Sequence, residues 1–307
     1  MEFSGRDSIA SRLLGKSQAI AEIRERLPKV ARSDLTVLIT GESGVGKTLV
    51  AEIIHNLSPR SSKEFIHLNC SNISPELFES ELFGHERGAF TGAVVRKRGK
   101  IEVADGGTMF LDEIGDLHLN NQAKLLLFMD KGIFYRLGGT EKHGADVRFI
   151  AATNRNIRQE IKKGRFRQDL YFRLGVYEVN IPPLRERKED IALLAEEILK
   201  RESSRMGSEK SLSSEALNKL LSYDWPGNVR ELENVLKRAV IKSEEGVLKG
   251  AHVSFLLSYN DNNNTWPKKA NYRMVRDTLI RCRGNKSLAA KELGISRQWL
   301  YKILRRN

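Results

Sequence analysis

The sequence predicts an α/β fold with a parallel sheet, followed by a helical subdomain and a small all-α helix-turn-helix domain. Three observations lead to this prediction. Apolar, β-branched runs alternate with helical patterns through the first ~180 residues, which is typical of strand–helix units on a parallel sheet. The pattern becomes helical after Pro182 and Pro183, and a strongly basic segment ends the chain.

Each expected strand is an apolar run with enough chain after it for a crossover helix. The expected strands are residues 35–40, 65–69, 108–111, 147–152 and 176–181. The expected helices of the next subdomain are 190–205, 213–223 and 228–243, with Ser213 as an N-cap. The Asn-rich stretch 258–267 is poor in core-forming residues and indicates a linker. We therefore expect an α/β subdomain (1–183), a helical subdomain (184–257), a linker (258–269) and an all-α domain (270–307).

The composition is that of a globular protein, with 40% hydrophobic and 30% charged residues in 307. No apolar run approaches the ~20 residues of a membrane helix, and the first residues lack the apolar segment of a signal peptide. The expected location is the cytoplasm, without a membrane partner. Cys70 and Cys282 are too far apart in sequence to suggest a zinc site or a disulfide framework.

The net charge of +13 is concentrated at one end. Residues 268–307 contain twelve Lys or Arg and two acidic residues, so they carry +10, and the rest of the chain shares +3. This asymmetry favours a polyanion-binding tail, and nucleic acid is the first candidate. A basic pair of solvated helices gives the same count and remains an alternative.

A phosphate-binding loop is predicted at residues 41–48, because the apolar run 37–40 leads into GESGVGKT. This matches G-x-x-x-x-G-K-[ST] at a strand-to-helix junction. In such loops backbone N–H groups face the phosphates, the lysine reaches the β- and γ-oxygens, and the hydroxyl ligates magnesium. ATP and Mg²⁺ are the expected cofactors. The predicted nucleotide-binding residues are Gly41, Glu42, Ser43, Gly44, Val45, Gly46, Lys47 and Thr48.

Two carboxylates, Asp112 and Glu113, follow the apolar run 108–111. Together with a phosphate loop they predict hydrolysis: Asp112 would join Thr48 in holding the magnesium, and Glu113 would polarise the attacking water. Taken alone, such a pair more often begins a helix. Its combination with the loop favours the catalytic interpretation.

Further motifs cover the chain from about Leu14 to its end. They are ELFGHE (81–86), GAFTGA (88–93), GGT (106–108), ATN (152–154), FRQDLYFRL (166–174), PPLRER (182–187) and WPGNVREL (225–232). With these motifs the sequence resembles the bacterial enhancer-binding proteins, AAA+ ATPases that activate transcription by sigma-54 RNA polymerase. The resemblance implies a P-loop AAA+ sheet with a helical lid subdomain.

Residues 88–93 also have a physical interpretation of their own. Glycines on both sides of Ala89, Phe90 and Thr91 favour a mobile loop with an exposed aromatic tip, although such a Phe commonly packs back on its own domain. The resemblance implies that the loop moves with the nucleotide state and contacts the sigma factor, chiefly through Phe90 and Thr91. The expected contact residues are Gly88, Ala89, Phe90, Thr91, Gly92 and Ala93.

Arg167 and Arg173 are too far from the phosphate loop in sequence for spacing to assign a role, and composition favours two solvated arginines. The resemblance implies that both are arginine fingers, which reach the γ-phosphate bound by a neighbouring subunit of a hexameric ring. Dimers are expected at rest.

The resemblance assigns three more residues: Asn154 as the γ-phosphate sensor, Asn69 as a switch that holds Glu113, and Arg230 as the lid arginine that closes on the nucleotide. Each could instead be a structural hydrogen-bonding residue. Thr48 departs from the family, which often has an acidic residue there. Few residues precede Leu14, so we expect either control by a separate regulatory protein or a sequence that is part of a longer protein.

The basic tail predicts a helix-turn-helix. A short helix, a turn at Gly294 and a second helix capped by Ser296 fit that geometry, and the tail resembles the Fis-type domain of the same activators. Trp299 either packs or contacts a thymine methyl group, and packing is favoured. A basic helical cap on the ATPase is the alternative for the whole tail. The expected DNA contacts are Ser296, Arg297, Gln298, Tyr301, Lys302 and Arg305.

The sequence therefore predicts a ring-forming ATPase that binds double-stranded DNA at an upstream enhancer site and remodels sigma-54 RNA polymerase to form the open complex. One alternative is a replication-initiator or DNA-remodelling AAA+ ATPase, which would lack the loop at residues 88–93. Another is a repressor that binds DNA without hydrolysis, which the complete hydrolytic set disfavours.

Overall fold

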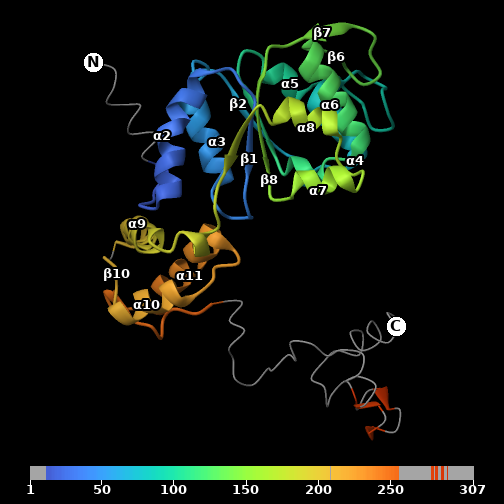
Figure 1. Ribbon diagram of the computed structural model, residues 1–307. Coiled ribbons are helices and arrows are strands. Elements are labelled where there is room, and N and C mark those ends of the chain that lie inside the picture. Colours follow the sequence, from blue (N-terminus) through green and yellow to red (C-terminus); the bar gives the residue numbers. More distant parts are fainter. Residues whose placement is uncertain are drawn as a thin grey trace, which may run out of the picture. The chain divides into compact units, whose positions relative to one another are not determined.

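The computed structural model describes residues 12–207 and 209–255 and, near the C-terminus, residues 278–279, 281–282, 285–286 and 289. The chain forms two compact units that divide after Val253 (Figure 1). The first unit contains an α/β body and a helical lid. In the second unit, helical backbone is described at Thr278, Arg281, Lys286 and Ala289.

A five-stranded parallel sheet forms the centre of the α/β body. The predicted strands are confirmed with ends that differ by at most two residues, and the three strands β5, β8 and β1 are mostly buried. The carboxyl ends of parallel strands meet at one edge of a sheet, where ligands bind in folds of this kind. In order across the sheet, the strands are β2 (Phe65–Asn69), β5 (Thr108–Asp112), β8 (Arg148–Thr153), β1 (Val37–Thr40) and β9 (Tyr177–Asn180).

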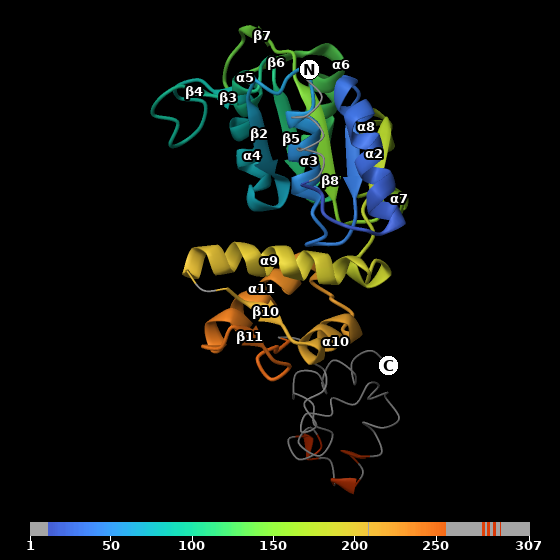
Figure 2. The same cartoon turned by 90° about the vertical axis from the view of Figure 1, so that its left-hand side faces the viewer.

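Helices cover both faces of the sheet (Figures 1 and 2). Alternation along β1 divides the core, because Val37 and Ile39 pack into one hydrophobic cluster while Leu38 packs into the other. Helices α2 (Gln18–Arg32) and α3 (Lys47–Asn56) contribute to the first cluster. The second contains residues of α4 (Pro75–Phe83), α5 (Lys100–Val103), α6 (Leu119–Lys131), α7 (Ile157–Lys162) and α8 (Gln168–Leu174).

Two short antiparallel strand pairs lie outside the main sheet. β3 (Gly84–His85) pairs with β4 (Lys97–Arg98), and β6 (Ile133–Tyr135) pairs with β7 (Lys142–Gly144). The segment between β3 and β4 projects from the body as a long loop (Figure 2). This loop carries residues 88–93, so a two-stranded base anchors the motif.

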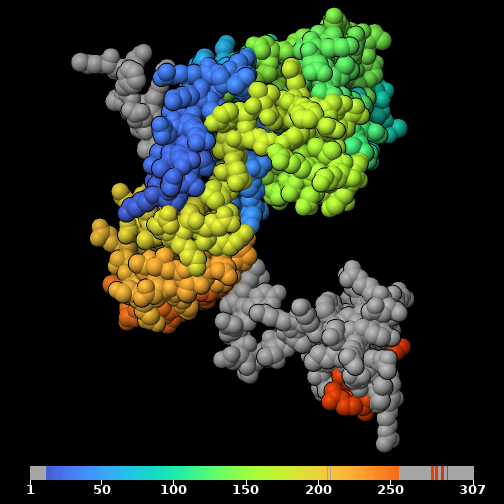
Figure 3. All heavy atoms as spheres, viewed as in Figure 1, coloured from blue at the N-terminus to red at the C-terminus, as the bar shows by residue number. Residues whose placement is uncertain are grey.

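The lid contains α9 (Asp190–Met206), α10 (Ser214–Ser222) and α11 (Asn228–Lys242), with β10 (Ser211–Leu212) parallel to β11 (Val247–Leu248). The three helices predicted here are confirmed, and the Ser213 side chain accepts a hydrogen bond from the Ala216 N–H as the N-cap of α10. Trp225 is fully buried and donates from its indole nitrogen to the Leu220 carbonyl. The lid, yellow to orange, lies against the blue part of the α/β body (Figure 3).

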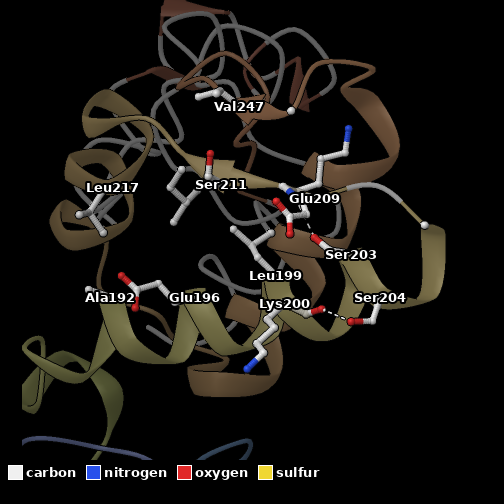
Figure 4. A pocket seen from close by; sticks show the side chains of 14 residues that line it. Ala192, Glu196, Leu199, Lys200, Ser203, Ser204, Glu209, Ser211, Leu217 and Val247 are labelled. Atoms are coloured by element: carbon white, nitrogen blue, oxygen red, sulfur yellow. Dashed lines mark hydrogen bonds between the residues drawn. The ribbon is translucent and has the colours of Figure 1, made fainter.

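A pocket of about 940 Å³ opens within the lid, between α9, α10 and the β10–β11 pair (Figure 4). Leu199, Leu212 and Leu217 supply its apolar surface, and Glu196 and Lys200 lie on α9 beside them. The residues predicted to bind nucleotide do not line this pocket. None of the described helices combines the length and apolar character needed to cross a membrane.

Candidate functional site

The phosphate loop joins the end of β1 to the start of α3. Gly44 and Gly46 have φ angles of +81° and +109°, a region that residues with a Cβ rarely adopt. The Lys47 ammonium donates to the carbonyls of Gly41 and Glu42 at 3.0 and 3.2 Å. These two carbonyls therefore have a protein partner in Lys47, and the motif predicts that the loop's N–H groups receive an anion.

Lys47 also connects the loop to the acidic end of β5. Its side chain is 6% exposed, and its ammonium lies 3.7 Å from the Glu113 carboxylate. The other Glu113 oxygen accepts a hydrogen bond from the Asn154 N–H at 3.1 Å. Three segments far apart in sequence therefore meet here, at the carboxyl ends of β1, β5 and β8.

Asp112 has the environment of an ionised carboxylate. Burial by itself would raise the pKa of Asp112, but the nearby His67 ring, the hydrogen bond from the Glu113 N–H and the charge of Lys47 lower it. The His67 ring nitrogen lies 3.6 Å from the carboxylate. No sequence motif pointed to His67; only its position on β2, beside β5 in the sheet, shows that it lies near Asp112.

The structure brings Asn69 and Asn154 to the same sheet edge. Asn154 follows β8, and Asn69 ends β2 in register with Asp112. The Asn69 side-chain oxygen accepts hydrogen bonds from the N–H and hydroxyl of Ser71, at 3.0 and 2.7 Å. The Glu113 contacts described here are with Lys47 and Asn154, so the switch and sensor roles of the two asparagines stay predictions.

The donor set suits magnesium held with a nucleotide. Mg²⁺ in such sites takes one or two protein ligands, and phosphate oxygens and waters complete its shell. Thr48, in the first turn of α3, and Asp112, at the end of β5, are the predicted protein ligands. Within the described residues no three His, Cys, Asp or Glu side chains are grouped to hold a metal by themselves. The chain's residues fit Mg²⁺ that arrives with ATP.

The lid reaches the phosphate loop directly. Arg230 donates to the Ser43 hydroxyl at 3.0 Å, and Asn228 donates from its side chain to the Ser43 carbonyl at 3.0 Å. Arg185 forms a two-point ion pair with Glu42. The hydrogen bond from Arg185 lowers the pKa of Glu42, so this carboxylate is ionised beside the loop. Arg185 and Asn228 lie in the motifs PPLRER and WPGNVREL, but their spacing from the phosphate loop predicted no role for them.

Arg167 and Arg173 lie at the two ends of α8 and are exposed. Arg167 pairs with Asp169 at 2.6 Å, and Arg173 donates to the Met129 carbonyl at 2.7 Å and pairs with Asp130. Phe172, between them, is 64% exposed. Both arginines are accessible to another molecule, and their role in a neighbouring subunit's site stays a prediction.

The loop at residues 88–93 is closed on itself by a hydrogen bond from the Gly88 N–H to the Ala93 carbonyl, 2.8 Å long. Phe90 contacts the His85 ring edge-to-face, with ring centres 5.1 Å apart, and keeps 37% of its surface exposed. The aromatic tip therefore packs partly on its own domain and partly faces solvent. The sequence left two expectations open, an exposed Phe90 and a Phe90 packed on its own domain, and each of them describes part of this arrangement.

The predicted DNA contacts lie outside the described residues. They are Ser296, Arg297, Gln298, Tyr301, Lys302 and Arg305.

A parallel sheet with a phosphate loop on its first strand, an acidic pair on a neighbouring strand and a helical lid over the loop defines the class: an AAA+ ATPase module. Sequence models identify the family. Residues 13–180 match the sigma-54 interaction domain, residues 185–270 the AAA+ ATPase lid domain, and residues 270–306 the bacterial regulatory protein, Fis family. The chain belongs to the family of sigma-54-dependent transcriptional activators.

Curated relatives agree with this assignment. The chain is 50% identical over 236 residues to the Nif-specific regulatory protein of Enterobacter agglomerans, covering 77% of this chain and 46% of that protein. It is 41% identical over 309 residues to the response regulator protein PilR of Pseudomonas aeruginosa, covering 96% and 69%. The chain thus spans about half the length of the first of these relatives.

Solved structures share the fold. NtrX from Brucella abortus in complex with ATP superposes with a TM-score of 0.73 at 32% identity, covering 96% of this chain and 69% of NtrX. The complex of the same protein with ADP gives a TM-score of 0.73 at 31% identity. The sheet and lid described above are therefore a scaffold found in a nucleotide-bound relative.

Proposed function

We propose that this chain hydrolyses ATP, with Mg²⁺, to remodel sigma-54 RNA polymerase at promoters whose upstream DNA its C-terminal domain binds. The observation that carries the proposal is the contact of Lys47 with Glu113 at 3.7 Å, which joins the phosphate loop to the acidic strand end. The sigma-54 interaction domain and the Fis-family match support the two macromolecular partners.

Each residue near the phosphate loop has a definite task in this proposal. Lys47 and the loop N–H groups bind the phosphates, while Thr48 and Asp112 hold the magnesium. The magnesium supplies positive charge to the phosphate oxygens when it is bound. Glu113 accepts a proton from the attacking water, because its carboxylate directly follows the strand that ends beside the loop and is 17% exposed.

Two variants distinguish the residues that bind ATP from the residue that takes part in its hydrolysis. Lys47→Ala should lose ATP binding, because no other buried ammonium lies at the loop among the described residues. Glu113→Gln should keep ATP binding and lower turnover by roughly 10²–10⁴-fold, the typical contribution of a general base. A nucleotide-binding titration and a phosphate-release assay distinguish the two. Near-normal turnover by Glu113→Gln would contradict the assignment of the base.

The polymerase contact is tested at Thr91. Thr91→Ala should keep ATP turnover and DNA binding and abolish open-complex formation, because the loop at residues 88–93 projects from the body on its own strand pair (Figure 2). Val103→Ala is a matched control, since Val103 is 41% exposed on α5 and outside the loop. Normal transcription activation by Thr91→Ala would remove the loop from the proposal.

A further inference from the structure

Lid residues contact each of four consecutive positions of the phosphate loop, and we call this set of contacts the lid clasp. The Glu42 carboxylate binds Arg185 and Asn228, and the Ser43 carbonyl accepts from Asn228. The Val229 N–H donates to the Gly44 carbonyl, the Arg187 side chain donates to the Val45 carbonyl, and Arg230 donates to the Ser43 hydroxyl, each at 3.0 Å.

The lid clasp is tightly packed. Arg187 and Asn228 are 2% and 0% exposed, and Asn228 has a φ of +53°. A Cβ on Gly44 would lie 2.4 Å from the Gly227 carbonyl, so lid backbone and loop backbone are in direct contact. The Arg187 Nε is buried and has no hydrogen-bond partner among the described residues, which costs free energy, while another guanidinium nitrogen of Arg187 donates to the Val45 carbonyl. The outer face of the loop is therefore shaped by the lid.

Glu42 places a carboxylate beside the proposed triphosphate site, where its negative charge repels phosphate. Its two oxygens accept from Arg185 at 2.6 and 2.8 Å, and Asn228 donates to one of them at 3.1 Å. The Arg185 guanidinium neutralises the charge of this carboxylate. Since Asn228 also accepts from the Leu184 N–H at 2.8 Å, the pair is fixed to the segment that leads into the lid.

We propose that the ion pair between Glu42 and Arg185 is a latch that couples lid position to nucleotide affinity, with Glu42 acting as a positioning residue and not as a phosphate ligand. This rests on the proposed function. While the latch is closed, the loop is held in the conformation that presents its N–H groups, so the nucleotide does not have to order it. When the latch opens, the loop loses its outer support and the uncompensated carboxylate lies beside the phosphates. Lid opening and nucleotide release are then one event.

The test is stopped-flow release of a fluorescent ADP analogue from the full chain. Arg185→Gln should accelerate release by about 10-fold and raise the KM for ATP more than it lowers kcat, since a charge-assisted two-point pair backed by an amide is lost. Arg185→Lys should lie between Arg185→Gln and the wild type, because it keeps the charge and loses the fork. The matched control is Arg201→Gln, which removes a 2.6 Å pair with Glu233 inside the lid and should leave release unchanged.

A double-mutant cycle tests whether Glu42 and Arg185 affect nucleotide release through their contact with each other. In a Glu42→Gln background, Arg185→Gln should accelerate release by less than about threefold, because its partner charge has already been removed. Equal acceleration in both backgrounds, or an Arg185→Gln effect no larger than that of Arg201→Gln, would overturn the proposal. Urea unfolding of each variant identifies loss of fold, and if Arg185→Gln does not fold, Arg185→Lys and Glu42→Gln provide the same cycle. Failure of the wild type to bind the ADP analogue would instead contradict the proposed function.

Discussion

Glu113 combines a left-handed backbone with contacts to two other segments. Its φ of +51° is uncommon for a residue with a Cβ and costs on the order of 1 kcal/mol or more. The strain places the carboxylate between the Lys47 ammonium and the Asn154 N–H. Strained residues of this kind cluster at functional sites, because the surrounding contacts hold them in the geometry that the chemistry needs.

Gly44 provides a prediction on the loop itself. Gly44→Ala places a Cβ 2.4 Å from the Gly227 carbonyl at a φ of +81°, so the lid must move and the residue is strained. We expect ATP affinity to fall by more than about 10-fold, since both the loop and the lid clasp are displaced. Isothermal titration measures the loss. Gly164→Ala is the matched control, because Gly164 has a φ of +66° with open space around it and should only lose about 1 kcal/mol of stability.

His55 gives the folded protein a pH dependence. Burial, with the charge of Arg148, lowers the pKa of His55 below 6.5, and its ring hydrogen-bonds the Thr108 hydroxyl at 3.0 Å. The unfolded chain therefore takes up a proton at higher pH than the folded chain. The stability that the neutral ring contributes is present above about pH 6.5 and is lost as the pH falls from there towards the folded pKa.

Thermal unfolding between pH 7.5 and pH 5.5 checks this. We expect the Tm of the wild type to fall over that range, and the Tm of His55→Gln, which cannot titrate there, to fall less. Carboxylates contribute little to the difference, because their ordinary pKa values lie below the range. Equal falls in the two proteins would show that His55 titrates alike in the folded and the unfolded chain and contributes no pH dependence.

At the scale of elements, the sequence predicted the strands and the lid helices well because local patterns determine them. Buried apolar runs such as Phe149 to Ala152 have few alternatives to a strand, and Ser213 marks the start of α10 by its capping chemistry. The acidic end of β5 was also predicted from a local pattern, an apolar run followed by two carboxylates. That this strand end lies beside the phosphate loop was inferred from the phosphate-loop motif, because the strand order of the sheet could not be predicted.

What the sequence did not predict depends on long-range contacts. Arg185 lies 143 residues from Glu42, and Asn228 lies 186 residues from it, so no spacing rule connects them. The proximity of His67 to Asp112 also cannot be predicted without knowing that β2 pairs with β5. The partial packing of Phe90 on His85 also required coordinates, because glycines on both sides of an aromatic residue allow either arrangement.

The N-cap of α10 allows an element-scale prediction. Ser213→Ala removes the side-chain oxygen that accepts from the Ala216 N–H at 3.1 Å, and we expect a loss of about 1 kcal/mol of stability. Urea unfolding with linear extrapolation measures it. The control is Ser214→Ala at the first helical position, where no capping bond is lost and alanine is a good helix former. Similar losses in both variants would mean that the cap does not stabilise the helix.

At the scale of the whole molecule, the complete site is expected to need a second copy of the chain. Arg167 contacts Asp169, and Arg173 contacts Asp130 and the Met129 carbonyl. The described contacts of the phosphate loop are instead with Lys47 and with the lid. An arginine supplied by a neighbour can stabilise the transition-state charge and is typically worth 10³–10⁵ in turnover. Hydrolysis should therefore rise more steeply than linearly with protein concentration.

Mixing two inactive variants tests whether Arg173 acts on a neighbouring subunit. Arg173→Ala keeps its phosphate loop and lacks a finger, whereas Lys47→Ala keeps the finger and lacks the loop. In a mixed ring some interfaces pair an intact loop with an intact finger, so ATP turnover should exceed the sum of the separate activities. In the control mixture, Tyr135→Ala replaces Arg173→Ala. Tyr135 is a 52% exposed residue of β6, and a chain with this substitution keeps both its phosphate loop and Arg173. If subunits exchange, as fluorescence transfer between labelled chains would show, and the Arg173→Ala mixture never exceeds the sum, then Arg173 acts within its own subunit or has no part in hydrolysis.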